Sequence, residues 1–171
     1  PPRSTLFPYT TLFRSEINLS AFSETDDAQG PLHKVEAKEQ PAEEEIKVCL
    51  EQFIGDIKQM PPKYSAIKMG GIPMHKLVRQ GKKVIRGPRF VTINSIEIIN
   101  YSWPILSIKV ICQSGVYIRS LARDIGQDLK TGGYVASLQR TCIGPYKVDE
   151  AIKLEELKNK SFEKTKVPIE K

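Results

Sequence analysis

Two runs of alternating apolar and polar residues constrain the fold of this chain most strongly. Val91–Asn100 (VTINSIEIIN) and Ile105–Cys112 (ILSIKVIC) alternate in this way and are rich in β-branched residues, a pattern typical of strands that are buried on one face. A further strand is predicted at Tyr134–Gln139, and helices are predicted from Pro41 onward and over Tyr117–Leu129. Because strands and helices follow one another irregularly, we expect an α+β fold with a mostly antiparallel sheet flanked by helices.

The first helix is predicted from its charge and from its apolar period. Pro41 opens it, and residues 43–45 are all glutamate, which the helix dipole favours in a first turn. Apolar residues then recur at intervals of three and four, with Gly55 near the end of the pattern, and predict one buried helix face. These residues are Ile46, Cys49, Leu50, Phe53, Ile54 and Ile57.

The first 15 residues do not resemble the rest of the chain. The segment PPRSTLFPYTTLFRS has no acidic residue and no helical or strand period, and it lacks the features of a signal peptide. Its internal echo, STLFPYT followed by TTLFR, resembles translated adaptor sequence. We therefore expect residues 1–15 to be a non-native leader outside the fold, residues 16–147 to form the folded body, and residues 148–171 to form a helical tail.

Hydropathy and cysteine usage exclude several classes of protein. No apolar run reaches the roughly 18–20 residues that a membrane helix needs. The three cysteines (Cys49, Cys112 and Cys142) are far apart and form neither a disulfide framework nor a zinc ribbon, which favours reduced thiols in a cytoplasmic protein. His33 and His75 stand apart from any cluster of metal ligands, so we expect no metal.

Charge is distributed unevenly along the chain. Residues 61–147 carry 14 basic and 3 acidic side chains, a net charge of +11, whereas residues 16–60 carry 4 basic and 11 acidic ones. This asymmetry favours a face that meets a polyanion, although a merely solvated basic surface would have the same composition. The basic residues are spread over turns, strands and helices, and this favours nucleic acid over an anionic membrane surface.

One candidate site lies where a strand ends and a helix begins. Gly115 follows the strand, and Tyr117 and Arg119 fall at the start of the helix, beside exposed backbone N–H groups that suit an anionic ligand. The guanidinium of Arg119 can bind a phosphate or carboxylate through two bonds, and the ring of Tyr117 can stack on a base. The alternative is that Tyr117 is a core aromatic and Arg119 forms a surface ion pair with Asp124 or Asp128.

A second candidate site combines aromatic and basic residues on a loop. The segment Pro62–Lys68 (PKYSAIK) brings Tyr64 close to two lysines, a combination that suits an RNA backbone and stacked bases. A basic run follows, which is either solvated loop charge or a set of phosphate contacts. It consists of Arg79, Lys82, Lys83, Arg86 and Arg89.

Taken together, these stretches resemble a known family. The sequence contains QMPPKYSAIKMGG, LVRQGKKV, SGVYIRSLARDIGQDL and VASLQRTCIGPYKVDEAIKLEEL in this order, preceded by the acidic turn SETDDAQG at 23–30. From about residue 16 to 157 the chain resembles the bacterial tRNA pseudouridine synthase B family. The resemblance implies a pseudouridine-synthase-like catalytic domain that lacks its N-terminal part. It also implies an isomerase that converts a T-loop uridine of tRNA to pseudouridine without metal or cofactor, and a monomer whose partner is the tRNA T-arm.

The resemblance assigns roles to individual residues. It implies that Tyr117 stacks on the flipped target uridine and that Arg119 pairs with the catalytic aspartate. It further implies that Leu138 lines the uridine pocket, and that Tyr64 and Lys68 lie beside the RNA-binding cleft. The chemistry agrees, because a uridine that leaves its stack needs an aromatic plate, and a catalytic carboxylate needs a fixed partner.

The sequence departs from the family in its catalytic carboxylate. The family carries the aspartate in a Gly-x-x-Asp-Pro loop upstream of the acidic turn, and this pattern does not occur here. Phe13 occupies roughly the place of another pocket tyrosine, and His75 replaces a usual tyrosine. We therefore expect an inactive fragment that also lacks the family's C-terminal RNA-binding module. A non-catalytic RNA-binding or tRNA-folding protein, or a ribosome-associated structural protein, remains the alternative.

Overall fold

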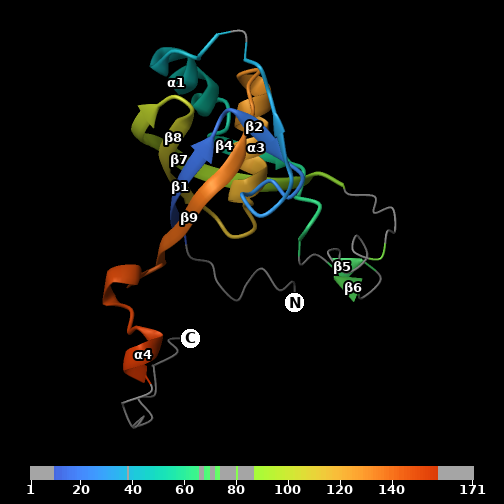
Figure 1. Ribbon diagram of the computed structural model, residues 1–171. Coiled ribbons are helices and arrows are strands. Elements are labelled where there is room, and N and C mark those ends of the chain that lie inside the picture. The colour runs from blue at the N-terminus through green and yellow to red at the C-terminus, as the bar shows by residue number, and fades with distance from the viewer. Residues whose placement is uncertain are drawn as a thin grey trace.

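A six-stranded antiparallel sheet organises the protein (Figure 1). The computed structural model describes residues 10–37, 39–65, 68–69, 72–73, 80 and 87–157. The sheet has the strand order β10-β9-β1-β8-β7-β4, and two small hairpins, β2–β3 and β5–β6, accompany it. Its strands are β1 (Thr11–Asn18), β4 (Gly55–Gln59), β7 (Arg89–Ser102), β8 (Ile105–Cys112), β9 (Tyr134–Ile143) and β10 (Tyr146–Lys147).

The remaining elements are short strands and helices. They are β2 (Ala21–Ser23), β3 (Leu32–Lys34), β5 (Lys68–Met69), β6 (Ile72–Pro73), α1 (Glu43–Glu51), α3 (Ile118–Asp128), the 3-10 helix η2 (Val148–Glu150) and α4 (Leu154–Leu157). The predicted α+β class with a mostly antiparallel sheet is confirmed. The predicted strands over 91–100 and 105–112 form the pair β7–β8. No helix among the described residues is long and apolar enough to cross a membrane.

Strand β1 lies inside the sheet, between β8 and β9. Phe13 faces Val110 of β8 and Arg140 of β9, so this part of the chain is paired on both edges. The expectation that residues 1–15 lie outside the fold is therefore wrong for residues 11–15, while residues 1–9 are outside the described residues. The strand period was hidden because two of the inward positions, Thr11 and Ser15, are polar, and both side chains are buried.

Helix α1 is shorter than its apolar period predicts. It ends at Glu51, and the chain continues into the edge strand β4, where Gly55 pairs with Ile93 and Ile57 pairs with Val91. Gly55 has a φ of +96°, a conformation that a helix cannot continue through. The prediction that the helix reaches Ile57 is thus wrong. Ile57 keeps its place against the core, but it does so from a strand.

Helix α3 packs against the sheet and carries the side chains that organise the candidate site. It buries Leu121, Ala122 and Ile125 in the core shared with β1, β7 and β8. A Cβ atom at Gly132, just after the helix, would come closer than 3.0 Å to the backbone of Ala21. This close approach brings β2, and with it the acidic turn at 23–30, alongside α3.

Some predictions fall outside the described residues. These include most of the basic run, of which the structure describes Arg89 alone. In the predicted helical tail, residues 148–157 are described and contain η2 and the short helix α4. Figure 1 shows α4 beyond the far end of β9, well away from α1.

Candidate active site

The guanidinium of Arg119 joins three segments of the chain at the start of α3. Its Nη1 donates to Asp27 Oδ2 at 3.0 Å and to the carbonyl of Thr25 at 3.3 Å, and its Nη2 donates to the carbonyl of Tyr64 at 3.0 Å. Both charged side chains of the pair are partly buried, at 27% and 22% exposure. A partly buried ion pair with directed bonds holds its groups more firmly than an exposed one. The alternative considered from the sequence, a surface pair with Asp124 or Asp128, is not the one formed by Arg119.

Asp27 is held in place by its own turn. Its Oδ1 accepts from Thr25 Oγ1 at 2.6 Å and from the N–H of Gln29 at 3.0 Å, while Oδ2 faces Arg119. An aspartate that bonds the backbone two residues on is typical of a tight turn. The turn therefore presents one carboxylate oxygen to the guanidinium in a fixed direction.

Tyr117 precedes the first residue of α3 and is bound through its backbone. Its N–H donates to Oε1 of Gln59 at 2.8 Å, and its carbonyl accepts from Nε2 of the same side chain at 3.1 Å. Gln59 is 1% exposed, whereas Tyr117 is partly exposed. The backbone of Tyr117 is thus anchored by a buried amide.

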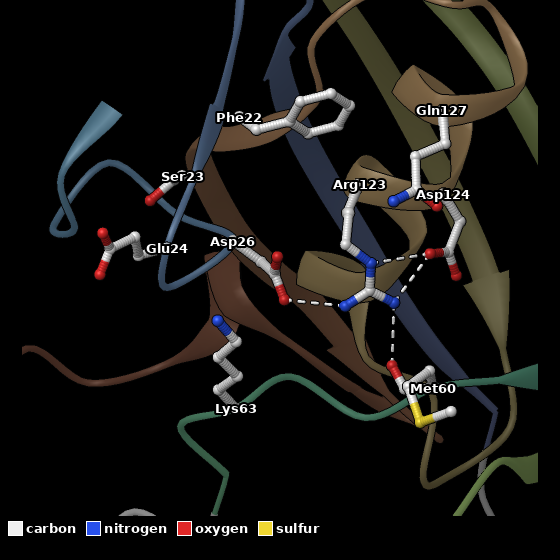
Figure 2. Close-up of a pocket in the computed structure, with 9 residues that line it drawn as sticks. All are labelled: Phe22, Ser23, Glu24, Asp26, Met60, Lys63, Arg123, Asp124 and Gln127. Carbon is white, nitrogen blue, oxygen red and sulfur yellow. Dashed lines mark hydrogen bonds and ion pairs between the residues drawn. The ribbon is translucent and has the colours of Figure 1, made fainter. Parts of the chain in front are cut away.

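One helical turn later, a second arginine of α3 also joins the acidic turn to the segment that follows β4 (Figure 2). Arg123 pairs with Asp26 at 3.0 Å and with Asp124 at 2.7 Å, and it also donates to the carbonyl of Met60. The same carbonyl accepts from Ser120 Oγ at 2.8 Å. Burial raises the pKa of the Asp124 carboxyl, and the adjacent guanidinium of Arg123 opposes this shift.

A cavity of about 430 Å³ lies beside this second arginine. In Figure 2 the ring of Phe22 forms one wall, and Lys63 extends toward Asp26 from the other side. Arg119 itself lies one turn further toward the start of the helix. The cavity is lined by Phe22, Ser23, Glu24, Asp26, Met60, Lys63, Arg123, Asp124 and Gln127.

Three of the five predicted site residues lie close together in the structure. Arg119 contacts Tyr64 directly, and Tyr117 lies two residues before Arg119 at the start of the same helix. Leu138 lies on β9, opposite Ser15 of β1, and is 45% exposed. Lys68 begins β5, and its side chain lies outside what the structure describes. A place for Leu138 beside the bound base stays a prediction.

Several residues of the site were missed by sequence reasoning. No local motif marks Asp26 and Asp27 as partners of arginines more than 90 residues away. The acidic turn at 23–30 was the one sequence feature that could have pointed to these two aspartates. Gln59 is the first residue of the stretch QMPPKYSAIKMGG, but nothing local in that stretch marks its amide as a partner of Tyr117. Phe13 is buried on β1, with Arg140 stacked over its ring at 5.1 Å.

The arrangement suits binding of a flat ligand. It offers a partly exposed phenol at Tyr117 beside the guanidinium that Asp27 fixes, and such a ring can stack on an aromatic base. Among the described residues, no group of three His, Cys, Asp or Glu side chains could hold a metal ion.

Comparison with family models covers almost the entire chain. Residues 9–118 match the model of the TruB family pseudouridylate synthase N-terminal domain. Residues 119–169 match that of the tRNA pseudouridylate synthase B C-terminal domain. The two matches meet inside α3.

Curated relatives carry the same description. The chain is 42% identical over 149 residues to a tRNA pseudouridine synthase B of Francisella tularensis subsp. holarctica, covering 86% of this chain and 49% of the relative. It is 41% identical over 145 residues to one of Xanthomonas oryzae pv. oryzae, covering 85% of this chain and 47% of the relative. The chain thus spans about half the length of these relatives.

Solved structures agree on the fold. A chain in a crystal structure of a Cbf5–Nop10–Gar1 complex matches with a TM-score of 0.64 and 26% identity, covering 90% of this chain and 36% of that chain. A second match, in a structure of an H/ACA RNP bound to a substrate RNA, has a TM-score of 0.55 and 21% identity, with 85% and 32% coverage. The sequence matches are extensive enough to settle the relationship: this chain belongs to the TruB family of pseudouridylate synthases.

Proposed function

We propose that this chain is the part of a tRNA pseudouridine synthase that receives the target uridine of the T-loop. The reaction breaks the C–N glycosidic bond of uridine and rejoins the base to the sugar through carbon. The observation that carries the proposal is the Arg119 fork, which ties Asp27 and the carbonyl of Tyr64 to the start of α3, beside Tyr117.

In this proposal each residue has a physical task. The ring of Tyr117 stacks on the everted base and offsets the few kcal/mol, roughly, that unstacking costs. Leu138 supplies an apolar wall, while Tyr64 and Lys68 contact the RNA next to the base. Asp27 fixes the guanidinium of Arg119, and in this proposal that guanidinium also pairs with the catalytic carboxylate.

Asp27 is better suited to hold Arg119 than to attack the substrate. Both of its carboxylate oxygens already accept bonds, one from the turn and one from the guanidinium. A nucleophile or base needs a free oxygen directed at the substrate. Since the Gly-x-x-Asp-Pro pattern is absent from the sequence, we propose that the chain binds the RNA and does not turn it over.

The partner in this proposal is the T-arm stem-loop of tRNA, bound by a monomer in the cytoplasm. Support for an RNA partner comes from the charge of +11 over residues 61–147 and from the curated relatives, which are tRNA pseudouridine synthases. Phosphate contacts then supply position, and the everted base supplies selectivity.

The test combines binding with product analysis. A T-arm hairpin and a scrambled hairpin of equal length are titrated with the chain, and the recovered RNA is digested and analysed for pseudouridine by mass spectrometry. We expect at least about tenfold preference for the T-arm hairpin, the value of one stacked base, and no pseudouridine. Equal binding would contradict the proposed substrate, and product formation would show that another carboxylate in the chain serves.

The net charge of +11 over residues 61–147 also fits a second candidate, a non-catalytic protein that binds or folds tRNA. This candidate also predicts RNA binding. It differs in predicting that the full-length parent protein has no catalytic aspartate. A full-length parent with a Gly-x-x-Asp loop that forms pseudouridine would exclude it. A full-length parent that lacks the loop, forms no pseudouridine and accelerates refolding of tRNA would favour it.

A further inference from the structure

Gln59 is a buried polar side chain whose hydrogen bonds all go to one residue in the described contacts. It ends β4 and is 1% exposed. Its Oε1 accepts the N–H of Tyr117 at 2.8 Å, and its Nε2 donates to the carbonyl of Tyr117 at 3.1 Å. We infer that Gln59 is a positioning residue that sets the backbone of Tyr117, and through it the placement of the ring that meets the base. The second half of this inference rests on the function proposed above.

The geometry resembles that of paired strands. In an antiparallel sheet, two opposite residues exchange an N–H and a carbonyl in the same two-bond pattern. Here a side-chain amide replaces the partner strand. The carbonyl of Tyr117 also accepts the N–H of Leu121 at 3.0 Å, the first bond of α3. The amide of Gln59 therefore fixes the residue at which the chain changes from extended to helical.

Gln59 also begins a segment that runs along the first turns of α3. The carbonyl of Met60 accepts from Ser120 and Arg123, and that of Tyr64 accepts from Arg119. These five hydrogen bonds thus join residues 59–64 to Tyr117 and to the first turns of α3. A displacement of this loop by RNA would be passed to Tyr117 first through Gln59.

Packing alone does not require an amide at this position. An apolar side chain of similar length would fill the same volume, and it would leave the backbone groups of Tyr117 without these partners. A glutamate would keep an acceptor for the N–H but would place a carboxylate against the carbonyl of Tyr117. The Gln59→Met variant therefore removes both hydrogen bonds while keeping the side-chain volume. The Gln59→Glu variant removes only the bond to the carbonyl of Tyr117.

The first test needs no RNA. Hydrogen exchange of the Tyr117 amide is measured by NMR in the wild-type chain, in Gln59→Met and in the control Gln139→Met, whose residue is exposed on β9. We expect the Tyr117 amide to exchange at least about tenfold faster in Gln59→Met, while core amides of β8 keep their protection. Gln139→Met should leave both unchanged. Unchanged protection of Tyr117 in Gln59→Met would overturn the inference.

Gln59→Glu keeps the test decisive if Gln59→Met does not fold. The remaining acceptor should preserve protection of the Tyr117 amide, while the fluorine resonance of 3-fluorotyrosine at position 117, assigned with Tyr117→Phe, should shift. A resonance at the wild-type position would show that the second bond does not orient the residue and would contradict the inference.

The second test measures the consequence for binding. T-arm hairpins with a uridine or an abasic site at the target position are titrated with each variant. The preference for uridine should fall about tenfold in Gln59→Met, and the salt dependence should not change, because the phosphate contacts persist. If the preference survives, the positioning role is wrong. If the wild-type chain itself shows no preference, the proposed function fails, while hydrogen exchange still decides whether Gln59 holds Tyr117.

Discussion

At the scale of single residues, Arg119 performs a task that lysine cannot. Its planar group donates in two directions, toward the turn at Asp27 and toward the carbonyl of Tyr64. An ammonium is a point charge that reaches only one of these places at a time. The fork therefore links the acidic turn, the loop at Tyr64 and α3 through one side chain.

Arg119→Lys should lower the free energy of unfolding by about 1–3 kcal/mol, because a partly buried carboxylate and a carbonyl lose their donors. Urea unfolding followed by circular dichroism measures this change. Arg14→Lys is the matched control, since Arg14 is exposed on β1, and it should change stability by less than about 0.5 kcal/mol. Equal effects of the two substitutions would argue against the bridging role of Arg119.

The three thiols should differ in reactivity. Burial raises the pKa of Cys49 to about 12, with Asp128 contributing, and that of Cys112 to about 11. Because only the thiolate is nucleophilic, iodoacetamide at pH 8 should modify the half-buried Cys142 first. Peptide mass spectrometry after timed quenching measures the order. Early modification of Cys49 or Cys112 in the folded chain would contradict their placement in the core.

How much of the site the sequence predicts depends on how local the signal is. Tyr117 and Arg119 were predictable because the strand end, the glycine turn and the helix start are contiguous. Asp27 was not, because its position beside Arg119 depends on the packing of β2 against α3. Gln59 was not, because its amide acts on a residue 58 positions away.

At the scale of elements, glycines decide how closely β2 and α3 approach. A Cβ atom at Gly132 would overlap the backbone of Ala21, and one at Gly126 would overlap the backbone of Gly132. Backbone atoms cannot yield as a side-chain end can. The proximity of the acidic turn to the arginines of α3 therefore depends on the absence of these side chains.

Gly132→Ala should destabilise the fold by about 3 kcal/mol, because overpacking forces the backbone to move. Gly87→Ala is the control, since an added Cβ there meets nothing within 4 Å, and its effect should stay within about 0.5 kcal/mol. The two midpoints of thermal unfolding are compared. Similar midpoints would mean that Ala21 of β2 does not pack closely against Gly132.

The elements also show where pattern reasoning fails. The strands β7 and β8 were predictable because their alternation is regular and their inward residues are apolar. Ile57 fits the helical spacing of the preceding apolar residues only by coincidence. The chain leaves the helix before it, because Gly55 has a left-handed φ. In β1, polar residues at buried positions concealed a strand whose pairing is visible only in three dimensions.

At the scale of the whole molecule, the uneven charge predicts how RNA binding responds to salt. Each neutralised phosphate releases counterions, so the dissociation constant for a T-arm hairpin should rise by more than about tenfold between 50 mM and 200 mM salt. Fluorescence anisotropy at several salt concentrations gives the slope. A flat response would contradict the interpretation of the basic segment as a phosphate-binding face.

The position of β1 within the sheet has a consequence for how the protein is made. This strand leaves the ribosome before its neighbours, yet Ser15 bonds to Ser137, 122 residues later. Long-range pairing of this kind slows folding, since the intervening loop must close before any contact rewards it. During translation both edges of β1 therefore stay unpaired until β8 and β9 have emerged. A chaperone that binds exposed strands would bind this segment in that interval.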